Sequence, residues 1–210
     1  MKVIIFDFDG TIANSFQLIA EISHELAKRP GLVSDAEMSQ MRTLSLVQVA
    51  RNFNIPKWKW PYMIHRGKYL MTKRINQVEP FPGIAEILQT LYNERYVLVI
   101  VSSNSKKNIE RFLVQHGIGN NFDQIYGGVG LYGKARVLRK ILRRNNIAAT
   151  EAMYIGDEIR DVEAAKQVNM PCIAVGWGFN TPEMLAAHAP TIVVRQPKQL
   201  LSVIEEWNQV

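Results

Sequence analysis

The sequence predicts an α/β protein with a doubly wound, mostly parallel sheet and an all-helical insertion after the first strand. Three observations favour this fold. From Pro80 onward, short apolar runs alternate with helical patterns. Tyr96–Val101 is a continuous run rich in β-branched residues, which is typical of a strand covered on both faces. Polar groups follow several of the expected strands, where the crevice of such a sheet lies.

The sequence pattern of the N-terminal part indicates one strand followed by helices. We expect the first strand at Val3–Phe6, and helical apolar spacing predicts helices over the ranges Ser15–Arg29, Asp35–Phe53 and Trp58–Val78. Turn-forming dipeptides separate these helices. We therefore expect an α/β core made of residues 1–14 and 80–210, with a helical cap formed by residues 15–79.

The sequence pattern of the rest of the chain indicates the remaining strands and helices of the core. Further strands are expected after the first, at Tyr96–Val101, Phe122–Tyr126, Ala152–Ile155, Cys172–Val175 and Thr191–Val194. Helices are expected between and after them, at Gly83–Asn93, Lys106–His116, Lys134–Asn145, Ile159–Val168 and Pro197–Trp207.

Composition limits the class of protein. The chain has 210 residues, of which 47% are hydrophobic and 21% charged, as in ordinary soluble domains. The single cysteine, Cys172, excludes an internal disulfide. We identify no signal peptide and no apolar stretch of the roughly 20 residues that cross a bilayer. We expect a cytoplasmic monomer or homodimer without a membrane partner.

The net charge of +6 is concentrated in one segment. Met38–Val78 contains no Asp or Glu, and it carries eight of the 25 Lys and Arg residues. A basic wall of this kind would attract a small anionic substrate. The interleaved aromatic residues leave nucleic acid open as a less favoured partner, and an ordinary solvated basic face is an equally simple interpretation.

Two carboxylates follow directly on the first expected strand. Asp7 and Asp9 are followed by Gly10 and Thr11, and residues two apart in an extended segment point the same way. Two close acids repel unless a divalent cation lies between them or one holds a proton. A metal site and a nucleophile with a general acid are therefore both open interpretations, beside a simple Asp-Gly turn.

Two other strand ends carry groups suited to phosphate and metal chemistry. Ser102, Ser103 and Asn104 precede an expected helix, whose free N-terminal donors suit an anion or merely accept a cap. Asp157 follows Gly156 and could complete an oxygen shell, with Asp161 behind it or capping a helix. Agreement among the three strand ends is stronger evidence than any one of them.

Lys134 has three interpretations. Gly128–Lys134 fits part of a phosphate-binding loop, but Ala135 stands where that loop needs a Ser or Thr hydroxyl. A buried lysine at a helix start would compensate several carboxylates and a phosphate. A solvent-facing lysine on a basic helix is the third interpretation.

Four ordered motifs carry a family resemblance. DFDGT at Asp7–Thr11, Ser102, Lys134 and GDEIRD at Gly156–Asp161 together resemble the haloacid dehalogenase superfamily, in its phosphoglycolate phosphatase-like branch with a small helical cap. The resemblance implies that Asp7 is the nucleophile and Asp9 the general acid and base. It makes Ser102 and Lys134 phosphate ligands and implies Mg²⁺ held by Asp7, Asp157 and the backbone carbonyl of Asp9. Asp161 would support the site, as would Gly10, Thr11 and Asn104, and Ser103 would join the phosphate ligands.

The resemblance implies a magnesium-dependent phosphatase that forms an aspartyl-phosphate on a small phosphate monoester such as phosphoglycolate. Asp9 favours a phosphate ester, because a departing halide needs no proton. A sugar phosphomutase of the same superfamily and a non-catalytic phosphate- or nucleic-acid-binding module are the alternatives. Arg42, His65, Arg66 and Lys68 are the cap residues that charge and position suggest for specificity.

Overall fold

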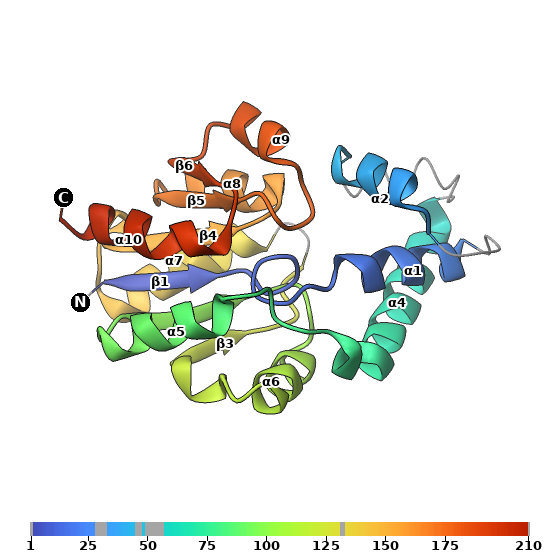
Figure 1. Ribbon diagram of the computed structural model, residues 1–210, viewed down its shortest axis with the longest axis horizontal. Coiled ribbons are helices and arrows are strands. Elements are labelled where there is room, and N and C mark those ends of the chain that lie inside the picture. The colour runs from blue at the N-terminus through green and yellow to red at the C-terminus, as the bar shows by residue number, and fades with distance from the viewer. Residues whose placement is uncertain (1, 28–32, 45–47, 49–56, 131–132, 210) are drawn as a thin grey trace.

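The computed structural model describes residues 2–27, 33–44, 48, 57–130 and 133–209, and its core is one parallel sheet (Figure 1). Six strands lie in the order β3-β2-β1-β4-β5-β6, and every pairing between neighbours is parallel. Their bounds are β1 Val3–Phe6, β2 Val97–Val101, β3 Gln124–Tyr126, β4 Ala152–Gly156, β5 Cys172–Val175 and β6 Ile192–Val194. The predicted doubly wound sheet is confirmed.

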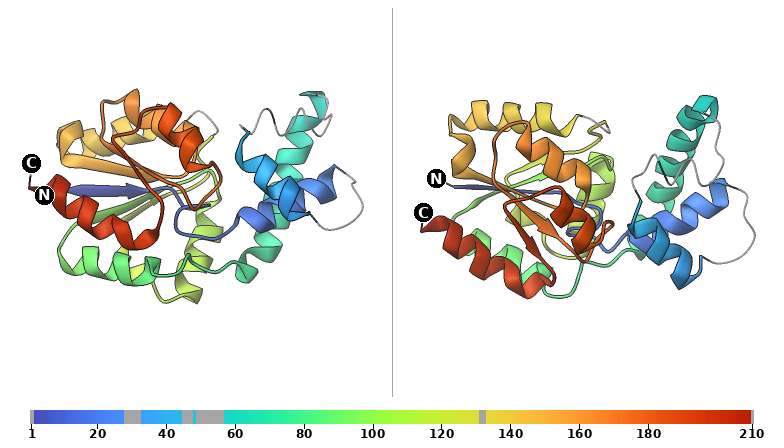
Figure 2. Two further views of the ribbon diagram at one scale, coloured as in Figure 1. Left: turned by 45° about the horizontal axis from the view of Figure 1, so that its top comes forward. Right: turned by 90° about the horizontal axis from the view of Figure 1, so that it is seen from above.

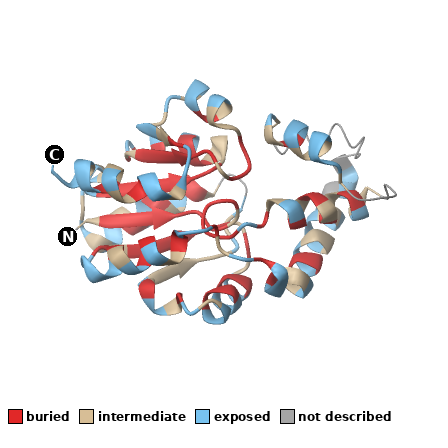
Figure 3. Cartoon of the chain, viewed as in Figure 1, coloured by how far each residue is buried: buried red, intermediate tan, exposed pale blue. Residues whose placement is uncertain are grey.

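Helices cover both faces of the sheet. Strands β1, β4 and β5 are therefore buried along their whole length (Figure 3). Ile4 and Phe6 pack on one face with α5, α6 and α10, whereas Val3 and Ile5 pack on the other with α7, α8 and α9. The bounds of these helices are α5 Ile84–Asn93, α6 Lys106–Gln115, α7 Lys134–Asn145, α8 Ile159–Lys166, α9 Pro182–Ala187 and α10 Leu200–Asn208. The short α9 was not expected from the sequence. It begins at a cap where the Thr181 side chain accepts from the Met184 N–H at 3.3 Å.

The described helices between β1 and α5 lie beyond the carboxyl ends of the strands (Figures 1 and 2). They are α1 Phe16–Leu26, α2 Asp35–Arg42 and α4 Trp60–Arg74, with 3₁₀ turns at Lys57–Lys59 and Ile75–Gln77. The helix predicted for Asp35–Phe53 begins at the expected residue, but its predicted C-terminal end is wrong. α2 stops at Arg42, where the Thr43 hydroxyl donates to Gln40 O at 2.8 Å and the Thr43 N–H turns back to Gln40 O. The remainder of that range, apart from residues 44 and 48, lies outside the described residues.

The two connections between these helices and the sheet run side by side. Asn14 N–H donates to Glu79 O at 2.8 Å, and Phe81 N–H donates to Ile12 O at 3.0 Å. Ala13 forms an isolated antiparallel bridge with Pro80. The segment therefore leaves and re-enters the core at one place, next to the end of β1. None of the helices in the described ranges is both long and apolar enough to cross a membrane.

Candidate active site

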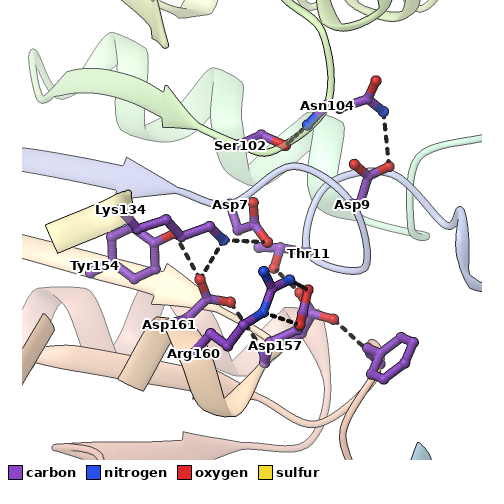
Figure 4. A network of polar contacts seen from close by, with 12 residues as sticks. Asp7, Asp9, Thr11, Ser102, Asn104, Lys134, Tyr154, Asp157, Arg160 and Asp161 are labelled. Carbon is purple, nitrogen blue, oxygen red and sulfur yellow. Dashed lines mark hydrogen bonds and ion pairs between the residues drawn. The ribbon is translucent and has the colours of Figure 1, made fainter. Parts of the chain in front are cut away.

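Asp7 follows directly on β1 and continues its alternation. Val3 and Ile5 face α7 and α8, so Asp7, two residues further, faces the same side. Its backbone N–H donates to Ile155 O at 2.8 Å, which fixes the start of the loop against β4. The side chain is almost fully buried, and its Oδ2 lies 2.9 Å from Lys134 Nζ (Figure 4).

Lys134 lies between two carboxylates. It is the first residue of α7, and its Nζ also donates to Asp161 Oδ1 at 2.5 Å. Asp161 is itself held by the Tyr154 hydroxyl, 3.0 Å from Oδ1, and by the Glu158 N–H, 3.0 Å from Oδ2. Burial disfavours the charged lysine, but Asp161 and Asp7 outweigh burial and raise the Lys134 pKa above its ordinary value. Lys134 therefore stays cationic, and Asp161 positions it toward Asp7.

Asp157 follows β4 in a fully buried position. Thr11 Oγ1 donates to its Oδ1 at 2.8 Å, and the Phe179 N–H donates to its Oδ2 at 2.6 Å. Gly10 has a φ of +79°, and a Cβ added there would overlap the Asp157 carboxylate. Burial and the nearby Asp7 raise the pKa of Asp157 well above its usual range.

Asp9 points in another direction. β1 ends at Phe6, and the backbone N–H groups of Thr11, Ile12 and Ala13 all turn back to Phe8 O. Asp9 Oδ1 consequently accepts from Ser15 Oγ at 2.9 Å. It also accepts from Asn104 Nδ2 at 3.2 Å (Figure 4). Loss of surrounding water raises the Asp9 pKa to about 6, although these two hydrogen bonds lower it. The expectation that Asp7 and Asp9 point the same way is therefore wrong, because the chain turns at Phe8 and does not stay extended through Asp9.

The carboxylates of Asp7, Asp157 and Asp161 form a group that could hold a metal ion. One oxygen of each lies within 4.8 Å of the others. Asp7 Oδ1 is buried and has no hydrogen-bond partner within the described part of the chain. Burial raises the Asp7 pKa to about 7, against the opposing effect of Lys134. A hard divalent cation fits this cluster because carboxylate oxygens are the ligands it prefers and its charge would offset the repulsion among the three acids.

The loop after β2 faces the same site. Ser102 is buried, and its Oγ accepts from the Asn104 N–H at 3.0 Å. Ser103 and Asn104 line a cavity together with Asp9. The loop after β3 docks on this segment through Val129 N–H, which donates to Ser102 O at 3.0 Å. The structure thus brings together the predicted residues from the ends of β1, β2 and β4 and from the start of α7.

The cap residues suggested by the sequence have different positions. Arg42 Nη2 donates to Gly176 O at 2.8 Å, so this side chain ties α2 to the loop after β5. The Arg66 guanidinium lies 4.9 Å from the centre of the Tyr69 ring. Neither Arg66 nor His65 is among the described residues that line the cavity at Asp9, whereas Lys68 is.

Several supporting residues had no role in the sequence-based prediction. Trp177 Nε1 donates to Thr11 O at 3.2 Å, and the next residues bring the Phe179 N–H to Asp157. Arg160 pairs with Glu158 through contacts of 2.6 and 2.8 Å, beside the acidic cluster. Two features of the sequence could have indicated these residues. Trp177–Phe179 come shortly after an expected strand, and Glu158 and Arg160 lie inside the GDEIRD motif.

A parallel sheet that gathers three buried carboxylates and a buried lysine at its carboxyl edge supplies groups of the kind that an enzyme uses to bind a metal ion and to stabilise negative charge. The chain belongs to the haloacid dehalogenase-like hydrolase family, whose model matches residues 4–175.

The chain is also similar to individual hydrolases in sequence and in structure. The chain is 33% identical to a phosphoglycolate phosphatase from Synechococcus elongatus, over 98% of both chains. It is 26% identical to a pyrophosphatase from Listeria welshimeri, over 98% of this chain and 97% of the relative. A predicted phosphatase from Clostridium acetobutylicum has the same fold, with a TM-score of 0.81 at 22% identity over 98% of both chains. With the site geometry, these relatives make the chain a phosphatase-type hydrolase.

Proposed function

We propose that this hydrolase is a magnesium-dependent phosphatase that cleaves phosphate monoesters through a phosphoryl group carried on Asp7. The observation that supports this proposal most strongly is how the two oxygens of the Asp7 carboxylate are held. Lys134 holds Oδ2 at 2.9 Å, while Oδ1 is buried without a partner in the described residues. A carboxylate fixed by one oxygen and unpaired at the other is prepared to form a new bond.

The first half-reaction uses the two acids that the structure separates. An Asp7 oxygen attacks phosphorus and forms a P–O bond, and the bond from phosphorus to the ester oxygen breaks with its electron pair. Asp9 gives its proton to that departing oxygen. A carboxyl group with a pKa of about 6 holds a proton near neutral pH often enough to donate it.

The second half-reaction returns the enzyme to its starting state. Asp9, now ionised, takes a proton from a water molecule that attacks phosphorus. The bond between phosphorus and Asp7 breaks, and inorganic phosphate leaves. Ser15 and Asn104 keep the Asp9 carboxylate oriented for both proton transfers through their hydrogen bonds to Oδ1.

Charge on the phosphoryl oxygens is neutralised by residues of three strand ends. Lys134, at the start of α7, supplies a positive charge, and Ser102, which directly follows β2, would bind the phosphate. Mg²⁺ would be held by Asp7 and Asp157 with the Asp9 backbone carbonyl, and it would supply Lewis-acid stabilisation of these oxygens. Asp161, which already accepts two hydrogen bonds from side chains, would support Lys134. The helices of residues 15–79 would act as a cap over the reacting groups.

A phosphate-release assay with and without Mg²⁺ tests this function. The panel includes phosphoglycolate and pyrophosphate, because relatives carry names for those activities. We expect magnesium-dependent release that Asp7→Asn abolishes. Isomerisation primed by a sugar bisphosphate, without steady phosphate release, would instead identify a phosphomutase.

A further inference from the structure

A cavity of ≈ 520 Å³ extends from the site into the helical segment. Asp9, Ser103 and Asn104 form its polar end at the core. The cavity continues between α1 and α4, which pack against each other. In the proposed mechanism Asp9 protonates the ester oxygen, so the leaving group of a phosphate ester bound at Asp7 would lie on the Asp9 side. This cavity is therefore where the leaving group would lie.

The walls of the cavity are apolar. They are formed by three residues of α1, two of α4 and one of the loop after β3: Ile19, Ile22, Leu26, Ile64, Met71 and Val129. Apolar surface that faces an open space is stabilised when an apolar ligand displaces water from it. The change from a polar end to apolar walls matches a molecule with an anionic head and an apolar body.

Charged groups in the cavity are few. Asp9 and Lys68 are the charged side chains among the described residues that line it. A leaving group with its own carboxylate, such as glycolate, gains little from these walls and has one flexible lysine to meet it. The volume falls within the range of about 300–1,000 Å³ that is usual for sites of ligands much larger than a two-carbon acid.

We propose that the substrates of this enzyme are phosphate monoesters whose leaving group is an apolar body about the size of a six-carbon chain or ring. This inference rests on the proposed function, because it assigns the group that departs from phosphorus. The phosphoryl group is bound at Asp7, next to the polar end that Asp9, Ser103 and Asn104 form, and the apolar body lies between α1 and α4.

A homologous series of alkyl phosphates from methyl to hexyl tests the substrate class. These esters have similar leaving-group chemistry, so their kcat/KM values report burial of the chain. We expect kcat/KM to rise by up to about fourfold per added methylene, and by at least about thirtyfold from methyl to hexyl phosphate. We also expect hexyl phosphate to exceed phosphoglycolate. A series that is flat or falls with length overturns the inference.

Two substitutions locate the effect in the cavity. Gly67 lies on α4, and a Cβ there would contact Leu26 Cδ1 at 3.5 Å, so Gly67→Leu fills space between the two helices. It should lower kcat/KM for hexyl phosphate at least about tenfold more than for methyl phosphate. Ile64→Gln changes a half-exposed wall residue without disturbing the core, and it should reduce the length dependence as well.

His65→Leu is the matched control. His65 is exposed on the same helix and is not among the described residues of the cavity lining. It should leave the slope of the series unchanged, and an equal loss of slope in His65→Leu would overturn the assignment to the cavity. Absence of magnesium-dependent turnover of any ester would refute the proposed function itself. Turnover with no preference for chain length would refute this inference alone.

Discussion

Lys134 Nζ lies 2.9 Å from Asp7 Oδ2, and each of the two side chains is 4% exposed. The same ammonium group contacts Asp161 Oδ1, so one buried cation compensates two buried carboxylates. Removing one member of such a group leaves the others without their partner, which costs more than the interaction itself contributes.

Lys134→Met should therefore affect stability and activity together. We expect the free energy of unfolding to fall by about 3–5 kcal/mol at neutral pH, because buried carboxylates lose their cation. Phosphate release should fall by at least about a hundredfold. Chemical denaturation and steady-state kinetics measure the two effects. Arg136→Met, an exposed cation on the same helix, is the control and should change neither. Wild-type activity in Lys134→Met would contradict the assigned role.

Asp9→Asn tests proton transfer through its dependence on the leaving group. The amide cannot give a proton to the ester oxygen, so kcat/KM should fall by about 10²–10⁴ for alkyl phosphates. The loss should be much smaller for 4-nitrophenyl phosphate, whose leaving oxygen needs little protonation. Equal losses for both substrates would remove Asp9 from the role of general acid.

Stability and Mg²⁺ binding should depend on pH in a linked way. Burial raises the pKa of Asp7 from 3.8 to about 7 and that of Asp9 from 3.8 to about 6. Between about pH 4 and pH 7 the folded protein then holds protons that the unfolded chain has lost, so stability without metal falls as pH rises through this window. We expect Mg²⁺ to take the place of the Asp7 proton at the acidic cluster.

Thermal unfolding in Mg²⁺ and in EDTA checks this linkage. The rise in Tm caused by Mg²⁺ should be larger at about pH 8 than at about pH 5, because fewer protons compete with the ion. A rise that is independent of pH would show that Mg²⁺ does not bind the carboxylates of raised pKa.

Gly178→Ala should weaken metal binding. A Cβ at Gly178 would overlap Asp157 Oδ2 and Gly10 O, so it would displace the carboxylate that we assign to the ion. The Mg²⁺ concentration that gives half-maximal activity should rise by about 10–100-fold. Gly119→Ala is the matched control, since its Cβ would lie at an ordinary 3.8 Å from Leu113. A normal magnesium requirement in Gly178→Ala would contradict the role of Asp157.

The sheet and much of the site could be predicted from the sequence because both depend on local pattern. The apolar run Val3–Phe6 and the alternation within it determine which face Asp7 shares with Val3 and Ile5. GDEIRD places Asp157 at the end of β4 and Asp161 within the first turn of α8. Parallel strands then bring their carboxyl ends to one edge, so residues far apart in sequence meet.

The remaining features depend on contacts that hydrophobic periodicity and the sequence motifs do not encode. The direction of Asp9 follows from three backbone N–H groups that converge on Phe8 O. The support of Asp157 by Phe179 comes from a backbone N–H, which carries no side-chain signal. The early end of α2 depends on the Thr43 side chain, and the cavity depends on how α1 packs against α4.

The most direct test of the account is to trap the phosphorylated enzyme. The protein is mixed with Mg²⁺ and a phosphate ester, quenched in acid within one turnover, digested and examined by mass spectrometry. We predict that one phosphoryl group is carried on the peptide containing Asp7, and that it is absent after EDTA treatment and in Asp7→Asn. Efficient turnover with no phosphoryl group on Asp7, or with the group on another residue, would contradict the account.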